Sequence, residues 1–227
     1  MEPKYKELFS AAIDQVETLL QEVAEFYAGQ SLEDIQSEYR DTLYAAMKDY
    51  LESEGSVTRY RNEVRRAANN AFTLAFVAGW AEGGASGELP ADEQSWLDGR
   101  IEQEISFIDG MFSQLKDLRD NTELTMDEKL GRAQGYADGY TASVPGVYAQ
   151  GRIMAAPHID LILDGEDGAA TCQDCQRLKR EWHPAQWWVD NDYVPRPGNS
   201  FECGGYKCLH YLKDRDGNIW AGMGAGT

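Results

Sequence analysis

The chain has 227 residues and carries 21 Lys and Arg against 39 Asp and Glu, a formal net charge of −18. This acidity argues against sequence-independent binding of nucleic acid, because phosphate contacts need clustered cations, and against adhesion to an anionic membrane. With 42% hydrophobic and 26% charged residues, the composition is that of a globular protein with one large or two small domains.

The first predicted element is an amphipathic helix near the amino terminus. Apolar residues recur at spacings of three and four from Tyr5 to Phe26, which places them on one helix face. Acidic residues interrupt every apolar stretch and no small-residue cleavage site follows, so neither a signal peptide nor a membrane-spanning helix is expected. We therefore expect a cytosolic protein, in which cysteines bind metals more often than they form disulfides.

Three further helices are expected before residue 120. Ser31 is suited to cap the first of them. The second, from about Thr58 to Trp80, is apolar on more than one side and should be central. A Gly- and Pro-containing loop at 82–90 separates it from the third, about Asp92 to Leu118. The apolar stripe of the first consists of Ile35, Tyr39, Leu43, Met47 and Tyr50 or Leu51.

The next helix is expected to begin at Thr125, because Thr125 and Glu128 have the spacing of a capping box. Its glycines and proline predict either a kink or a close approach to a neighbouring helix. These residues are Gly131, Gly135, Gly139, Pro145 and Gly146.

The sequence changes in character after Pro157. The run at 158–164 predicts a short strand that ends in a turn. All four cysteines lie beyond this run, between Cys172 and Cys208. We therefore expect a mainly α chain with two domains: a multi-helix region at 1–157 and a small α+β, zinc-ribbon-like module at 158–227.

The cysteines form two compact pairs, Cys172-x2-Cys175 and Cys203-x4-Cys208, which are separated by 27 residues. Two such turns can place four sulfurs around one Zn²⁺ at bonds of about 2.3 Å. Glycines at 204 and 205 supply the permissive backbone that the second turn needs. A closed four-sulfur site has no position for a metal-bound water, so the expected zinc is structural. A disulfide and free thiols without metal are the alternatives.

Two histidines and a group of tryptophans lie near the cysteine pairs. His183 and His210 are reserve ligands, and His210 could replace Cys208, which precedes it by two residues. The tryptophans are expected to fill the small core of the module, and stacking on nucleic-acid bases is the alternative. These are Trp182, Trp187 and Trp188.

Residues 57–81 form a basic exception within the acidic chain, where only Glu63 opposes four arginines. Arg61 and Arg65 are one helical turn apart and therefore lie on one face of the predicted helix. The four arginines could contact an acidic partner surface or DNA. Intramolecular pairing with acidic neighbours is the alternative. The four are Arg59, Arg61, Arg65 and Arg66.

Catalytic signatures are few. The sequence has no glycine-rich phosphate loop, GxSxG elbow or HExxH helix. His158 and Asp160 are the one candidate for a hydrolase site, and a solvated acidic loop with Asp164 and Asp167 is the alternative. Because no nucleophile, base and orienting group can be named together, we expect no enzymatic activity.

Several segments of the cysteine-rich region share the pattern of one known family. They are the stretch from Gly168 to Leu178, Trp187, the turn from Tyr193 to Pro197, and the run Glu202–Cys208. These segments resemble the carboxy-terminal module of tailed-bacteriophage minor head proteins, also called head morphogenesis proteins. The resemblance covers about residues 168–212. Many relatives end in a Cys-Arg-Cys turn, whereas this chain has Leu209 and His210 after Cys208.

This resemblance implies a virion or assembly protein without catalysis of its own. It would act in the host cytoplasm during assembly and lie in the head interior or near the portal. The implied partners are the portal protein, the major capsid protein or both, and further copies of the chain; packaged DNA is an open alternative and no membrane is expected. A zinc-ribbon adaptor that binds nucleic acid or a host protein is the alternative function.

Overall fold

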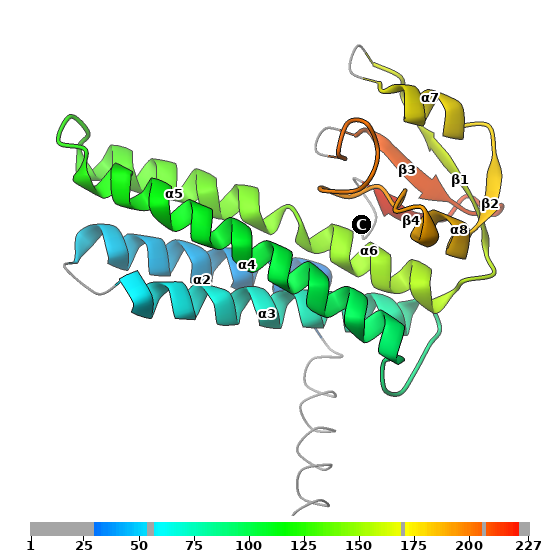
Figure 1. The fold of residues 1–227 in the computed structure, drawn as a ribbon, viewed down its shortest axis with the longest axis horizontal. Helices are drawn as coiled ribbons and strands as arrows, with labels where there is room; N and C mark the ends of the chain where they lie inside the picture. Colours follow the sequence, from blue (N-terminus) through cyan, green and yellow to red (C-terminus); the bar gives the residue numbers. More distant parts are fainter. Residues whose placement is uncertain (1–29, 54–56, 169–170, 206–207, 223–227) are drawn as a thin grey trace, which may run out of the picture.

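The computed structural model describes residues 30–53, 57–168, 171–205 and 208–222, and consists of a helical bundle followed by a small sheet-containing module (Figure 1). The predicted fold class, mainly α with a small α+β module, is confirmed. The helix predicted between Tyr5 and Phe26 lies outside the described residues. The bundle helices are α2 (Leu32–Glu52), α3 (Val57–Glu82), α4 (Ala91–Asp120), α5 (Met126–Thr141) and α6 (Val144–Ala155).

The module contains a four-stranded antiparallel sheet with the strand order β2-β1-β3-β4. The strand predicted at 158–164 is confirmed as β1. In the register of the central pair, Leu163 lies opposite Leu212 and Gly165 lies opposite His210. The elements are β1 (Asp160–Gly165), α7 (Gln173–Leu178), β2 (Trp182–Pro184), α8 (Ala185–Asp190), β3 (His210–Lys213) and β4 (Ile219–Gly222).

Ser31 and Thr125 cap two of the bundle helices, as predicted, and both caps are capping boxes. Ser31 Oγ accepts a hydrogen bond from the Asp34 N–H, and the Asp34 carboxylate accepts one from the Ser31 N–H, both at 3.1 Å. Thr125 and Glu128 make the same reciprocal pair at the start of α5. The predicted stripe of α2 is buried throughout, including both Tyr50 and Leu51.

Helix α3 is the central helix, as predicted, because it packs against α2, α4 and α6. Its crossing with α6 is close. A Cβ added at Gly79 would lie 2.0 Å from the carbonyl oxygen of Tyr148, and one at Gly151 would lie 2.3 Å from that of Phe76. The two glycines therefore allow the backbones of α3 and α6 to touch.

The helix predicted from Thr125 onward is interrupted. It ends as α5 at Thr141, and α6 follows with Pro145 in its first turn. The predicted close approach at Gly131, Gly135 and Gly139 is wrong, because a Cβ at any of these positions would meet no described atom within 4 Å. All three glycines face outward and are exposed.

Helix α6 contributes to two hydrophobic cores. Val147 and Tyr148 belong to the bundle core, whereas Ala149 and Ile153 belong to the core of the module. Arg152 adds polar contacts across the same junction: its Nε lies 3.1 Å from the Glu82 carboxylate, and its Nη1 donates to the Ile219 carbonyl at 2.8 Å. Bundle and module are thus joined by packing and not only by the chain.

Across the described residues, no helix combines the length and the apolar character needed to span a bilayer.

Candidate metal centre

The four cysteines come together at one end of the module. Cys172 is the N-cap of α7, and Cys175 lies in the first turn of that helix, so its sulfur turns inward. Cys203 lies in the turn before β3, and Cys208 lies two residues before that strand begins. Cys175 and Cys208 are buried, Cys172 and Cys203 are half-buried, and all four are free thiols.

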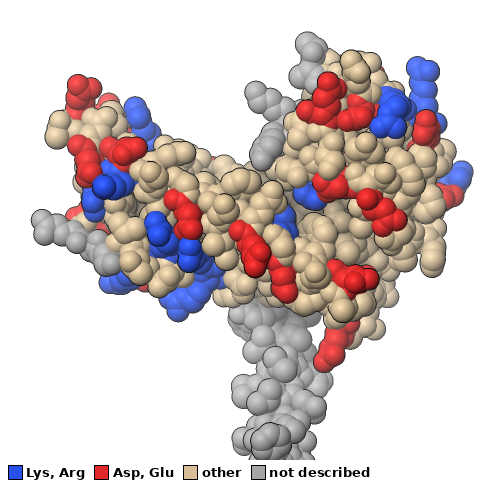
Figure 2. All heavy atoms as spheres, in the orientation of Figure 1, with Lys and Arg blue, Asp and Glu red and all other residues tan. Residues whose placement is uncertain are grey.

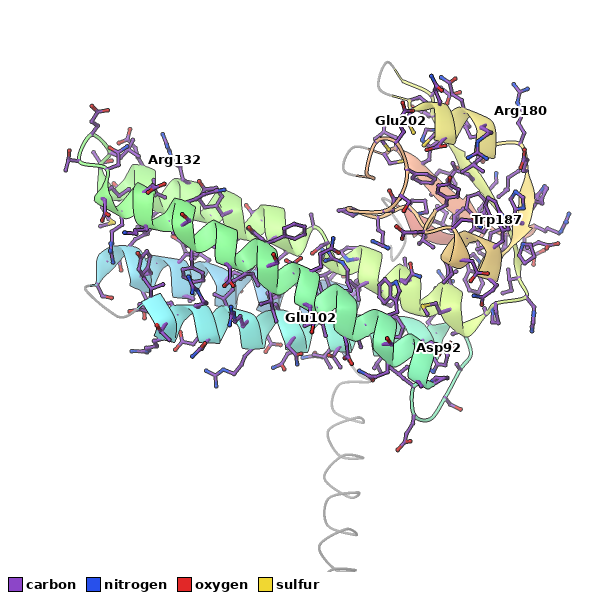
Figure 3. All side chains as sticks on the ribbon, viewed as in Figure 1. Asp92, Glu102, Arg132, Arg180, Trp187 and Glu202 are labelled. Atoms are coloured by element: carbon purple, nitrogen blue, oxygen red, sulfur yellow. The ribbon has the colours of Figure 1, made fainter. Side chains whose placement is uncertain are left out.

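Backbone geometry and hydrogen bonds hold the second cysteine turn against α7. Gly204 and Gly205 have φ values of +61° and +73°, which are costly for residues with a Cβ. This agrees with the predicted need for glycine. Glu202, labelled in Figure 3, accepts a hydrogen bond from the Gln173 N–H at 3.0 Å, and its own N–H donates to Asp174 at 2.9 Å. Each chain segment that carries a cysteine pair therefore anchors the other.

The sulfur atoms surround a small cavity of about 30 Å³ that the four cysteines and His210 help to line. Cys175 Sγ lies 3.4 Å from Cys172 Sγ and 3.6 Å from Cys208 Sγ. Two sulfurs on one tetrahedral zinc are about 3.8 Å apart. Two overlapping trios of donor atoms, each within 4.8 Å, are formed: Cys172, Cys175 and Cys203 make one, and Cys175, Cys208 and His210 make the other. The size of the cavity and the donor chemistry are compatible with one zinc ion, and Cys175 is the donor that the two trios share.

Electrostatics within the cluster favour at least one thiolate. The hydrogen bond from Cys175 lowers the pKa of Cys208 to about 5, although burial acts in the opposite direction. The same hydrogen bond, together with burial, raises the pKa of Cys175 far above its usual range. Thiolates are the form of cysteine that binds metals. The lowered pKa of Cys208 therefore favours the thiolate form of this residue.

His210 joins the cluster alongside Cys208 and does not take its place. Its Nδ1 lies 3.6 Å from Cys208 Sγ, and its Nε2 lies 3.4 Å from Asp167 Oδ1. Lys179 Nζ lies 3.1 Å from the same carboxylate oxygen. The sequence analysis missed Asp167 and Lys179 as neighbours of the site, because only the pairing of β1 with β3 brings the loop after Gly165 next to His210.

The other reserve ligand, His183, has different neighbours. Its ring stacks on Trp187 with centroids 3.7 Å apart, and its Nε2 lies 3.1 Å from the Glu181 carboxylate. Among the described residues it belongs to neither metal-capable trio. Trp188 is fully buried and donates to the Leu161 carbonyl, as expected of a core residue. Trp187, labelled in Figure 3, is half-buried. The predicted core position of Trp182 is wrong, because this side chain is exposed.

Lys and Arg side chains gather at the end of the bundle where α3 begins, whereas acidic side chains are spread over the whole face seen in Figure 2. Most of the predicted arginine patch is paired within the chain. Arg59 pairs with Glu63 at 3.2 Å, and Arg61 and Arg65 both pair with Asp109 of α4, at 3.3 and 2.6 Å. Arg66 is exposed and makes no ion pair with a described residue. This arrangement agrees with the intramolecular alternative.

The acidic residues beside β1 do not converge on His158. Asp160 pairs with Arg215 at 3.0 Å, Asp164 with Lys213, and Asp167 with Lys179 and His210. His158 itself is exposed.

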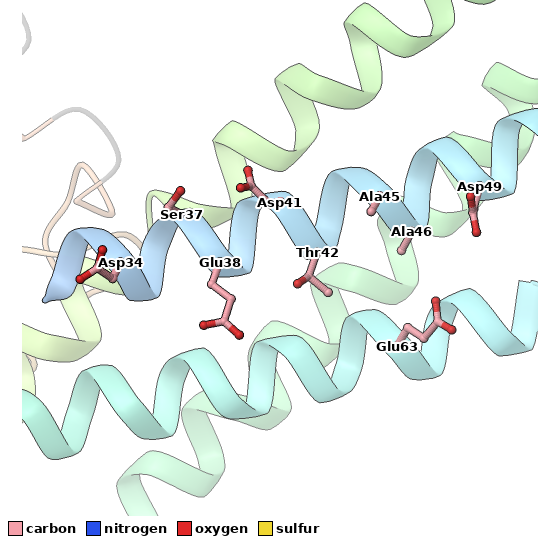
Figure 4. Close-up of a pocket in the computed structure, with 9 residues that line it drawn as sticks. All are labelled: Asp34, Ser37, Glu38, Asp41, Thr42, Ala45, Ala46, Asp49 and Glu63. Atoms are coloured by element: carbon pink, nitrogen blue, oxygen red, sulfur yellow. The ribbon is translucent and has the colours of Figure 1, made fainter. Parts of the chain in front are cut away.

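A shallow hollow of about 680 Å³ between α2 and α3 is lined mainly by carboxylates (Figure 4). Among the described residues, the groups that could hold a metal are those of the thiol cluster, and no carboxylate of this hollow belongs to one. The hollow is therefore a solvated acidic face. Its carboxylates are Asp34, Glu38, Asp41, Asp49 and Glu63.

A scan against protein-family models and searches of curated proteins and of solved structures each found no match to this chain. The thiol cluster therefore has to be interpreted from its own geometry.

Proposed function

We propose that this chain is a minor head protein of a tailed bacteriophage or prophage, in which a zinc ion held by Cys172, Cys175, Cys203 and Cys208 stabilises the carboxy-terminal module. The observation that carries the proposal is the convergence of the four sulfurs on one small, largely buried cavity. These cysteines lie within the segments that resemble head morphogenesis proteins. Four ligands fill the coordination of a structural zinc, and the proposed role is therefore assembly and not catalysis.

The bundle supplies the surface through which such a protein would act. Its long helices present acidic faces, including the hollow between α2 and α3, and the chain has a net charge of −18. These features favour contacts with other proteins over direct contacts with packaged DNA. The proposed partners are the portal protein and the major capsid protein.

Two measurements test the proposal at separate levels. Elemental analysis of the purified full chain should find one zinc per chain, which Cys175→Ser should abolish because Cys175 belongs to both donor trios. His183→Ala is the matched control and should keep the metal. Wild-type protein without zinc, after preparation in its presence, would refute the metal site.

The assembly role is tested by co-purification with a tailed-phage portal protein that is co-expressed with the chain, and by mass spectrometry of purified particles. We expect to find the chain in the complex purified with the portal protein, in the purified particles, or in both. Its absence from both would refute the role in the head and leave the metal site standing.

A further inference from the structure

The thiol cluster contains one donor more than a tetrahedral zinc can use. Cys175, Cys208 and His210 are all buried, with His210 only 2% exposed, whereas Cys172 and Cys203 are half-buried. Five donor atoms therefore face a site with four positions.

His210 lies as close to Cys208 as neighbouring cysteines lie to one another, and it forms a donor trio with Cys175 and Cys208. Successive separations are 3.4 Å from Cys172 to Cys175, 3.6 Å from Cys175 to Cys208, and 3.6 Å from Cys208 Sγ to His210 Nδ1. A sulfur and a nitrogen on the same tetrahedral zinc are about 3.6 Å apart. The position of His210 thus matches that of a ligand.

The two ring nitrogens of His210 have different neighbours. Nε2 faces the Asp167 carboxylate at 3.4 Å, and a carboxylate can only accept hydrogen bonds. Nδ1 faces the cysteines. A histidine whose other nitrogen donates to a carboxylate is the usual arrangement of a metal-ligating histidine. Lys179 holds Asp167 in place at 3.1 Å.

Building on the zinc site proposed above, we infer that Cys203 and His210 compete for the fourth position, while Cys172, Cys175 and Cys208 are common to both ligand sets. When His210 Nδ1 occupies this position, Cys203 Sγ leaves it and takes up a proton from water. Cys203 is the ligand to leave, because it lies in a turn, whereas the equally half-buried Cys172 is the N-cap of α7 and His210 is buried in β3.

The test is a set of Co²⁺ titrations of the full chain with Cys203→Ser, His210→Ala and the double variant. Each single change should weaken Co²⁺ binding by no more than about tenfold, because the other donor completes the site, whereas the double variant should lose at least about a thousandfold. His158→Ala, which changes an exposed histidine, should bind like wild type.

Spectra of the Co²⁺ complexes report how many sulfurs bind the metal. The Cys203→Ser complex should keep the intense visible bands of tetrahedral Co²⁺ and lose about a quarter of the sulfur-to-cobalt charge-transfer intensity. Near-ultraviolet circular dichroism of the Co²⁺-loaded variants checks that the module remains folded.

Two results would overturn the inference. One is a Cys203→Ser variant that binds as poorly as Cys175→Ser, and the other is a double variant no weaker than Cys203→Ser alone. In both cases wild-type protein still binds the metal, so the proposed zinc site would survive. Wild-type protein that binds neither Co²⁺ nor Zn²⁺ would refute both.

Discussion

Replacing Gly151 by alanine should destabilise the bundle, because the new methyl group would meet the α3 backbone. Its Cβ would lie 2.3 Å from the Phe76 carbonyl oxygen and 3.2 Å from the Trp80 nitrogen. A backbone obstacle cannot rotate away as a side chain can, so the two helices would have to move apart. Overpacking of this kind costs about 1–3 kcal/mol.

Gly135 provides the matched control within the same chain. It is also a helix-interior glycine, but a Cβ there would meet no described atom within 4 Å. Alanine in an unhindered helix is more favourable than glycine by about 0.8–1.0 kcal/mol, so Gly135→Ala should stabilise the protein by up to that amount.

Urea unfolding followed by far-ultraviolet circular dichroism measures both changes in the full chain. The free energies of unfolding of the two variants should differ by about 2–4 kcal/mol, and their melting temperatures by about 4–16 °C in a chain of this size. A Gly151→Ala protein as stable as Gly135→Ala would refute the close crossing of α3 and α6.

Three further changes test electrostatics and capping. Burial raises the pKa of Glu104 to about 7 from an ordinary value of 4.5. Between those pH values the folded chain holds a proton that the unfolded chain has lost, so stability should fall with rising pH by up to about 3 kcal/mol. Urea titrations across this pH range should show that the free energy of unfolding falls less steeply in Glu104→Gln than in wild type. Equal falls in the two proteins would contradict the raised pKa of Glu104. Asp109→Asn removes the partner of Arg61 and Arg65 and should cost at most about 1 kcal/mol, since these side chains are partly exposed. This loss in the free energy of unfolding should be smaller in high salt, and a loss that does not depend on salt would exclude an ionic cause. Thr125→Ala removes the cap of α5 and should cost about 1 kcal/mol in thermal unfolding, whereas Thr125→Ser should not.

Features set by residues within one or two helical turns were predictable from the sequence. The caps at Ser31 and Thr125 and the buried stripe of α2 depend on spacings of three and four, which the sequence displays directly. The glycines show where this reasoning fails. Even spacing marks Gly131, Gly135 and Gly139 as a stripe, but whether a neighbour covers it depends on the tertiary arrangement. Gly79 and Gly151 come from distant helices and have no common pattern in the sequence.

In the candidate metal site, too, local features could be predicted from the sequence and long-range contacts could not. The spacing of the cysteines predicts their convergence, because each pair forms a local turn. The ion pair of Asp167 with Lys179 and their contact with His210 depend instead on the register of β1 against β3. Likewise, the pairing of Arg65 with Asp109 depends on the packing of α3 against α4. Long-range pairing of this kind leaves no periodic signal in a single sequence.

The sequence changes character at Pro157, yet the two hydrophobic cores already meet along α6. Ala149 and Ile153 are buried in the core of the module, whereas Val147 and Tyr148 are buried in that of the bundle. Residues from 158 onward would therefore lack part of their own hydrophobic core if they were separated from the helices. Helix α6 contacts α3 from Tyr148 to Ala155, and its Ala149 and Ile153 are buried in the module. A module loosened by loss of the proposed zinc would uncover these two residues. Zinc affinity and folding of the module would then depend on the whole chain.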